Sequence, residues 1–260
     1  KSVVLWGRGR AYGQASAYGL IAEALRGLTQ QHLSLELRER IKAAVGDLGS
    51  EVLRLVPEMK TILGDVTAAV ELEPERRQQR FLNLMTNLFL SLGSKEAPLA
   101  LILDDIQWSD EASLHLITHL SKETLPFPLV MILGYRSEEV SPGGRVHRLL
   151  EQIKETRFGK VKEIKLAPLP DGEIKAIVHS MLGTNVQLVA DVVSNQAGGS
   201  PLFAVELVYA LVESGILRRT ESGWLVTNTK VLTEGRYGDN LIQTIVNRLS
   251  RLTDNQRLIL

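Results

Sequence analysis

The sequence predicts an α/β fold, in which helices separate the strands of a parallel β-sheet, followed by a region made of helices. Two runs, residues 99–103 and 128–134, are apolar throughout. Strands buried on both faces have this composition, and they belong to parallel sheets that helices cover on two sides. The segments between the runs have the apolar spacing of amphipathic helices.

The first part of the chain alternates predicted strands and helices. The β-branched run 3–6 predicts the first strand, which Gly7 ends. Pro74 suits the first turn of the clearest helix, and Gly93 follows its last turn. The remaining predicted strands cover residues 99–103, 129–133 and 161–166, and the predicted helices cover 18–28, 37–48, 74–92, 111–122 and 145–154.

After Pro168 and Pro170 the pattern becomes helical. Asp171 is the expected N-cap of the first helix of this region. The predicted helices cover 173–182, 186–197 and 201–214, a hairpin covers 216–227, and a last helical pattern begins near residue 240. This pattern is still running at residue 260, so we expect a further element downstream.

Charge and composition exclude several classes of protein. The 260 residues include 30 basic and 30 acidic side chains, so this segment is not expected to bind nucleic acid directly. The lack of cysteine excludes thiolate catalysis and cysteine-ligated zinc. No apolar run approaches the roughly 20 residues of a membrane-spanning helix, and no signal peptide is evident. We therefore expect a cytoplasmic protein that makes no membrane contact.

The most informative feature is the acid pair Asp104 and Asp105, directly after the apolar run 99–103. At the carboxyl edge of a parallel sheet, where open α/β folds bind ligands, such a pair suits nucleotide chemistry. One carboxylate would help to hold Mg²⁺, and the other would orient the attacking water. Alternatively, the two acids only begin a loop, and Ser109 or Asp110 caps the next helix; spacing alone does not decide between these interpretations.

Arg136 follows the next apolar strand. Because the carboxyl ends of parallel strands meet at one edge, its guanidinium can reach the acid pair and bind a terminal phosphate. An isolated arginine at such a position is more often a solvated loop residue. Its place one strand after the acid pair favours the functional interpretation.

Four segments resemble a known family when they are taken together and in order. They read DDIQWSD from residue 104, GYRSEEV from residue 134, LAPL from residue 166 and GGSPLF from residue 198. This order is similar to that in signal-transduction ATPases with numerous domains (STAND), which are P-loop NTPases of the AAA+ branch. More narrowly, the chain resembles the ATPase module of large bacterial sensors that carry serine/threonine-kinase-like and sensor regions.

The resemblance implies a role for each matching residue. Asp104 resembles the Walker B aspartate of the magnesium site, Asp105 the acid that activates water, and Arg136 the arginine that senses the γ-phosphate. Gly199 and Pro201 resemble the nucleotide-binding turn of the lid, whose proline packs near the adenine. The implied domains are an α/β core over 1–167, a helical lid with a small hairpin over 168–232, and the start of a winged-helix element over 233–260.

One motif of that family is missing. The sequence contains no Walker A loop G-x-x-x-x-G-K-[ST], the loop that cradles the phosphates. The family pattern places this loop and its strand just before Lys1, so the core is expected to lack its first strand. We therefore predict that the chain alone binds ATP poorly.

The resemblance implies an ATP-binding and ATP-hydrolysing regulatory module of a multidomain signalling protein, present here as a fragment. Its cofactors in the intact parent would be ATP and Mg²⁺. Its partners would be fused kinase, sensor or effector domains, with nucleotide-dependent self-association. The alternative is a non-catalytic NTPase-like scaffold or protein-interaction module, which the missing loop favours.

Overall fold

The computed structural model describes residues 2–11, 16–70, 73–123, 128–155, 161–221 and 223–233. The chain divides into two units, Lys1–Lys162 and Glu163–Leu260, which are described separately. The domain boundaries predicted after residues 167 and 232 remain predictions. All but the first residue of the predicted winged-helix segment, 233–260, lies outside the described residues.

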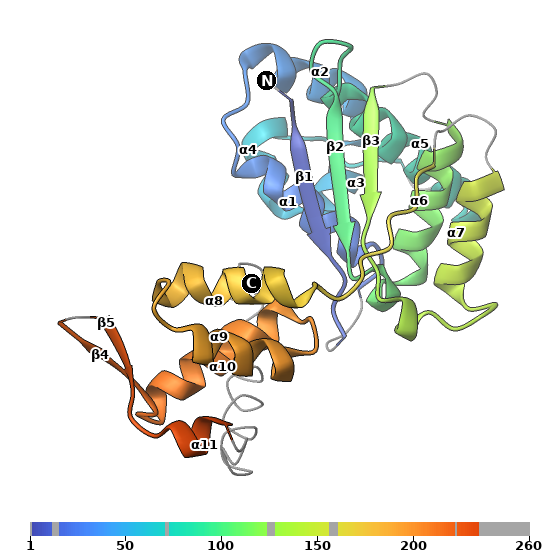
Figure 1. The fold of residues 1–260 in the computed structure, drawn as a ribbon. Helices are drawn as coiled ribbons and strands as arrows, with labels where there is room; N and C mark the ends of the chain where they lie inside the picture. Colours follow the sequence, from blue (N-terminus) through green and yellow to red (C-terminus); the bar gives the residue numbers. More distant parts are fainter. Residues whose placement is uncertain are drawn as a thin grey trace. The chain divides into compact units, whose positions relative to one another are not determined.

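In the first unit, strands β1 (Val4–Arg8), β2 (Leu99–Asp104) and β3 (Leu129–Leu133) form a parallel sheet in that order (Figure 1). Helices lie between consecutive strands, as parallel pairing requires. The predicted α/β class with a parallel sheet is therefore confirmed.

β1 runs through Gly7, contrary to the prediction that this glycine ends the strand. A Cβ at Gly7 would collide with the backbone oxygen of Leu20, in helix α1 (Gly19–Thr29). The glycine therefore lets α1 pack closely against the strand, and the strand continues to Arg8.

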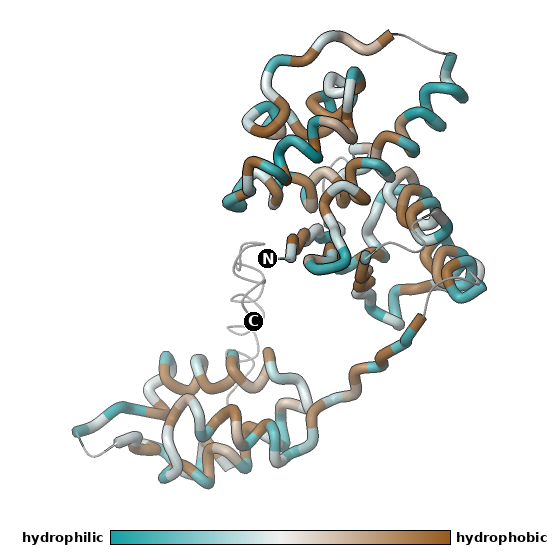
Figure 2. Tube along the Cα trace, turned by 90° about the horizontal axis from the view of Figure 1, so that it is seen from above, coloured by the Kyte–Doolittle hydropathy of each residue, from teal (hydrophilic) through white to brown (hydrophobic). Residues whose placement is uncertain are grey.

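The helices of this unit bury their apolar sides in one core. The long helix α5 (Pro74–Leu92) has the predicted bounds, and it buries Met85 and Phe89. Brown and teal residues alternate along the helices in Figure 2, as amphipathic helices require. The other helices are α2 (Leu35–Val45), α3 (Gly49–Leu55), α4 (Lys60–Leu63), α6 (Glu111–Glu123) and α7 (Arg145–Glu155), and the 3₁₀ turns are η1 (Gly46–Leu48), η2 (Pro57–Met59), η3 (Ile106–Trp108) and η4 (Ser137–Glu139).

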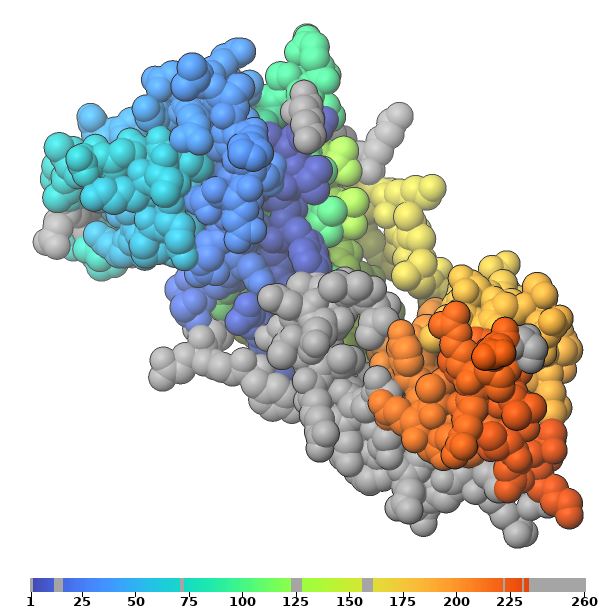
Figure 3. Space-filling model, turned by 90° about the vertical axis from the view of Figure 1, so that its left-hand side faces the viewer, coloured from blue at the N-terminus to red at the C-terminus, as the bar shows by residue number. Residues whose placement is uncertain are grey.

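Among the described residues of the first unit, the helices lie on one face of the sheet. In Figure 1 they lie behind and beside the strands, and in Figure 3 the blue and cyan helical segments gather on one side of them. Leu5 and Leu101 are fully buried on the covered face. The other face, called the open face below, carries aligned apolar side chains: Val4, Ala100 and Val130 in one row, and Trp6, Ile102 and Ile132 in the next.

The prediction that both faces are covered is wrong for the described residues. On the open face Val130 is 54% exposed and Ile132 is 50% exposed. The strand predicted over 161–166 is also absent, and Ile164 and Leu166 in that segment are 70% and 88% exposed. A strand is defined by its pairing, and no described strand pairs with this segment.

The second unit contains the helices predicted for this region. They are α8 (Asp171–Leu182), α9 (Gln187–Ala197) and α10 (Pro201–Glu213), followed by the antiparallel strands β4 (Leu217–Thr220) and β5 (Gly223–Val226) and the short helix α11 (Thr229–Thr233). Asp171 was expected to be the N-cap of α8, but Pro170 occupies that position and Asp171 is the first helical residue. Among the described helices, none is both long and apolar enough to cross a membrane.

Candidate functional site

The carboxyl ends of the three strands are tied together by backbone hydrogen bonds. The amide of Gly9 donates to the oxygen of Asp104 (2.9 Å), and the amide of Gly134 donates to the oxygen of Leu103 (2.8 Å). The amide of Ile106 then donates to the oxygen of Gly134 (3.1 Å). The residues that follow β1, β2 and β3 therefore meet at one edge of the sheet.

Asp104 is the last residue of β2 and lies on the same side of the strand as Ala100 and Ile102, the side of the open face. Its Oδ1 accepts a hydrogen bond from the amide of Asp105 (2.9 Å). A Cβ at Gly134 would collide with this oxygen, so a larger residue there would require the carboxylate of Asp104 to turn away. Within the described parts of the chain, no basic side chain pairs with Asp104.

Asp105 has very different surroundings, although it is the next residue. It is 5% exposed, and its backbone adopts the left-handed conformation at φ 49°. Its Oδ2 lies 2.7 Å from Arg8 Nε, and its Oδ1 accepts from Gln107 Nε2 (3.0 Å). Arg136 Nε lies 3.6 Å from the same Oδ1. Asp105 is therefore held between two arginines, whereas Asp104 has none.

Arg136 reaches this edge, as the order of strands predicts. Its Nη1 donates to Glu139 Oε1 (3.2 Å), and its Cζ lies 4.9 Å from the centre of the Trp108 ring. Its backbone amide donates to Gln107 Oε1 (3.4 Å). The structure therefore brings together Asp104, Asp105 and Arg136, although half of the Arg136 side chain stays exposed.

A family model for the AAA ATPase domain matches residues 1–132, slightly more than half of the 260 residues. The chain belongs to the AAA ATPase domain family. The match contains both Asp104 and Asp105 and ends just before Arg136. No curated protein and no solved structure matches the chain. Membership supports nucleotide binding and, in general, the use of Mg²⁺.

The edge of this AAA ATPase domain contains residues that sequence reasoning missed. Arg8 was not recognised, although it ends its strand just as Arg136 follows β3. Gln107, Trp108 and Glu139 stand in the segments that carry the resemblance, but no role was assigned to them. Strand order alone could have identified Arg8, had the end of the first strand been predicted correctly.

Gly199 and Pro201 belong to the second unit, where both have local structural roles. Gly199 has a positive φ of 78°, and its oxygen accepts from the amide of Leu169 (2.8 Å). A Cβ at this glycine would collide with Pro168 and Leu169. Ser200 caps α10, and Pro201 is the first residue of that helix. This geometry explains why the turn needs these residue types, and their roles toward nucleotide remain predictions.

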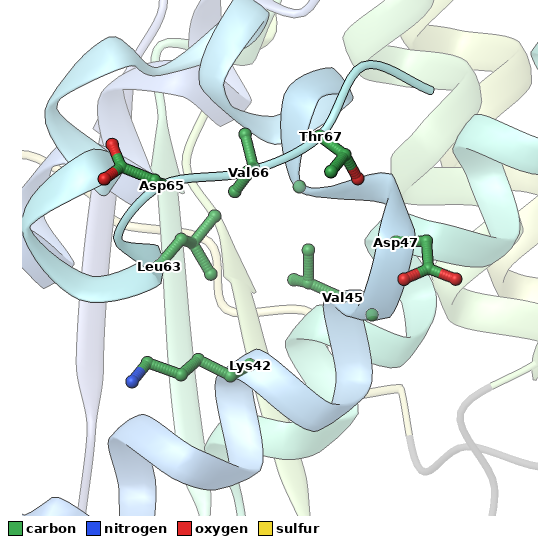
Figure 4. Close-up of a pocket in the computed structure, with 9 residues that line it drawn as sticks. Lys42, Val45, Asp47, Leu63, Asp65, Val66 and Thr67 are labelled. Carbon is green, nitrogen blue, oxygen red and sulfur yellow. The ribbon is translucent and has the colours of Figure 1, made fainter. Parts of the chain in front are cut away.

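Other candidate sites in the AAA ATPase domain are weaker. A hollow of about 220 Å³ lies at the end of α2, beside the loop that follows α4, and Lys42, Asp47 and Asp65 are among its lining residues (Figure 4). It shares no residue with the edge that carries Asp104 and Asp105. No group of three or more potential metal ligands occurs among the described residues.

Proposed function

We propose that this chain is the ATP-binding and ATP-hydrolysing module of a bacterial, cytoplasmic, multidomain signal-transduction protein of the STAND class. The observation that carries the proposal is the pair Asp104 and Asp105 at the sheet edge of an AAA ATPase domain, two adjacent carboxylates of which only Asp105 has arginine partners among the described residues. The fused domains would be kinase, sensor or effector regions, and nucleotide would control how they or further copies associate.

Asp104 is the residue that fits Mg²⁺. Magnesium prefers carboxylate oxygens, and Asp104 is a carboxylate without a basic partner in the described part of the chain. Bound Mg²⁺ would supply charge neutralisation at the phosphates. Because Gly134 has no Cβ, the carboxylate of Asp104 has room in its observed position, and a side chain at residue 134 would displace it.

Asp105 fits the task of orienting water. The ion pair with Arg8 and the hydrogen bond from Gln107 fix both of its oxygens, so little reorganisation is needed once a substrate is bound. Arg136, half exposed beside it, retains donors for an anionic γ-phosphate. The helices after Pro168 would form the lid, and Gly199 and Pro201 would lie near the adenine of the bound nucleotide.

We also propose that the phosphate-binding loop belongs to a strand and helix that precede Lys1 in the parent. The support is the edge of β3 as well as the open face. The amide of Leu99 in β2 donates to the oxygen of Pro128, and the amide of Gly134 donates to the oxygen of Leu103 in β2. Because backbone groups alternate in direction along a strand, the even-numbered residues from 128 to 134 direct theirs to β2. Leu129, Met131 and Leu133 therefore direct theirs to the opposite edge, where no described strand pairs with them. An added strand would pair there, and its helix would cover the open face.

A calorimetric comparison tests the proposal. We expect Mg-ATP to bind the parent, extended upstream through the loop, at least about 100-fold more tightly than this chain, because the loop adds two or more charged hydrogen bonds. Tight binding by this chain alone would contradict the proposed position of the loop. A parent without G-x-x-x-x-G-K-[ST] upstream and without ATP binding would instead support the scaffold function.

In the extended parent, Asp105→Asn is expected to lower kcat by about 100-fold or more while the Kd for ATP stays within about threefold. The amide keeps the size of the side chain, but it lacks the negative charge and the second acceptor oxygen with which Asp105 would pair with the arginines and orient water. Steady-state phosphate release and calorimetry give the two values, and Glu138→Gln is the control for a nearby loss of charge. An unchanged kcat would remove Asp105 from the mechanism.

A further inference from the structure

Trp108, Arg136 and Glu139 form a closed triangle at the carboxyl edge of the first unit. Trp108 Nε1 donates to Glu139 Oε2 (2.7 Å), and Glu139 Oε1 accepts from Arg136 Nη1 (3.2 Å). The guanidinium of Arg136 completes the triangle above the ring of Trp108, at 4.9 Å from Cζ to the centroid. Trp108 is the last residue of η3, Glu139 is the last residue of η4, and Arg136 directly precedes η4; the two turns follow different strands.

The triangle restricts Arg136 in more than one direction. Glu139 fixes one end of the guanidinium, the indole ring supports its flat face, and Asp105 Oδ1 lies 3.6 Å from its Nε. Glu139 is itself held, because one of its oxygens accepts from Trp108. A free arginine side chain samples many rotamers, and this arrangement selects one in which the guanidinium reaches Asp105.

Stability does not explain the triangle well. The side chains of Arg136 and Glu139 are 49% and 34% exposed, and ion pairs with such exposure contribute little to folding. A cation–π contact at an exposed site is also weak. Contacts of this size add little to the stability of the fold, but they are enough to favour one rotamer of Arg136 over others of similar energy.

We propose that Trp108 and Glu139 are positioning residues that hold the Arg136 guanidinium toward Asp105 for contact with an anionic phosphate. The value of this position for nucleotide binding rests on the proposed function of Arg136. The position itself does not, and it can be measured without nucleotide. No described residue accepts a hydrogen bond from Arg136 Nη2, which leaves that donor group for the anion.

Nitrogen-15 NMR of the whole chain without nucleotide tests the positioning. The Arg136 Nε–H resonance, assigned with Arg136→Ala, is expected to be as rigid as the backbone in the heteronuclear NOE. Glu139→Ala should make it flexible, and so should Trp108→Phe, which keeps a ring but removes the donor to Glu139. Glu138→Ala is the matched control, since no hydrogen bond or ion pair joins Glu138 to another described residue. The Glu138→Ala and Glu139→Ala variants should melt within about 2 °C of the wild type, as changes of exposed side chains do.

A flexible Arg136 side chain in the wild type would overturn the proposal, and so would an NOE that Glu139→Ala leaves unchanged. The second arm compares the ratio of the Kd values for Mg-ADP and Mg-ATP in the extended parent. Glu139→Ala should lower this ratio about threefold to fivefold, in the same direction as Arg136→Ala. An effect of Arg136→Ala without one of Glu139→Ala would contradict the positioning. If Arg136→Ala itself leaves the ratio unchanged, the sensing role in the proposed function fails, while the NMR result still decides the positioning.

Discussion

Leu101→Ala is expected to lower the free energy of unfolding of this chain by about 3–4 kcal/mol. Leu101 lies at the middle of the central strand β2, it is fully buried, and it points to the covered face of the sheet. Removal of its three outer carbons leaves a cavity among helices that cannot collapse completely, so the loss of contacts adds to the lost burial. Urea denaturation followed by circular dichroism measures the change.

Ile132→Ala is the matched control, because it removes the same number of carbons from a neighbouring strand. Ile132 is 50% exposed on the open face, so its truncation should cost no more than about 1 kcal/mol. Equal costs for Leu101→Ala and Ile132→Ala would mean that something covers the open face in this chain. In the extended parent the same Ile132→Ala change should become costlier, if an upstream helix covers this face as proposed.

Whether helices cover one face of the sheet or both could not be predicted from the sequence. The run 99–103 has the composition of a strand with two apolar faces, and this composition is the same whether or not the second face has a neighbour. The segment 161–166 fails as a strand prediction for a related reason. Its residues have strand propensity, but a strand also needs a partner backbone, and propensity contains no information on that partner.

Helices and the other strands were predictable because their signals are local. The apolar spacing of α5, the proline in its first turn and the glycine after its end all lie within residues 74–93, and the observed bounds agree with them. The position of Asp171 was the exception. An aspartate stabilises a helix either as its N-cap or in its first turn, so the sequence alone leaves the start of this helix uncertain by one residue.

Part of the candidate site was predictable by one rule of topology. Parallel strands end at the same edge, so the acid pair and Arg136 were expected to meet, and they do. The same rule applies to Arg8, which was missed only because the first strand was expected to end at Gly7. The contact of Trp108 with Glu139 was beyond such rules, because it depends on the 3₁₀ turns that two separate loops adopt.

The contacts of Asp110 agree with the alternative interpretation of its segment, in which Ser109 or Asp110 caps the next helix. One of its oxygens accepts from the amides of Tyr18 (2.8 Å) and Ser113 (2.8 Å). The other accepts from the amide of Gly19 (3.1 Å) and from the hydroxyl of Ser113 (2.6 Å). A single carboxylate therefore joins the N-termini of α1 and α6, where backbone amides have no partner within the helix.

Asp110→Ala is expected to lower the free energy of unfolding by about 2–4 kcal/mol, because it removes two caps at once and leaves partly buried amides without partners. Chemical denaturation again gives the value. Glu111→Ala is the matched control, since Glu111 is an exposed acid in the first turn of the same helix and should cost less than about 0.5 kcal/mol.

The titration of the Tyr18 hydroxyl provides a second test of the position of Asp110 beside helix α1. Burial raises the pKa of its hydroxyl above the ordinary value of 10.0, and the negative charge of Asp110 raises it further. The ionised form of Tyr18 is thus disfavoured in the folded state, so the free energy of unfolding should fall as pH rises above 10.0. Asp110→Asn removes the charge, so it should move the titration of Tyr18 toward lower pH and make this alkaline loss smaller. If Asp110→Ala costs no more than Glu111→Ala, and Asp110→Asn leaves the titration unchanged, then Asp110 does not join the two helices in solution.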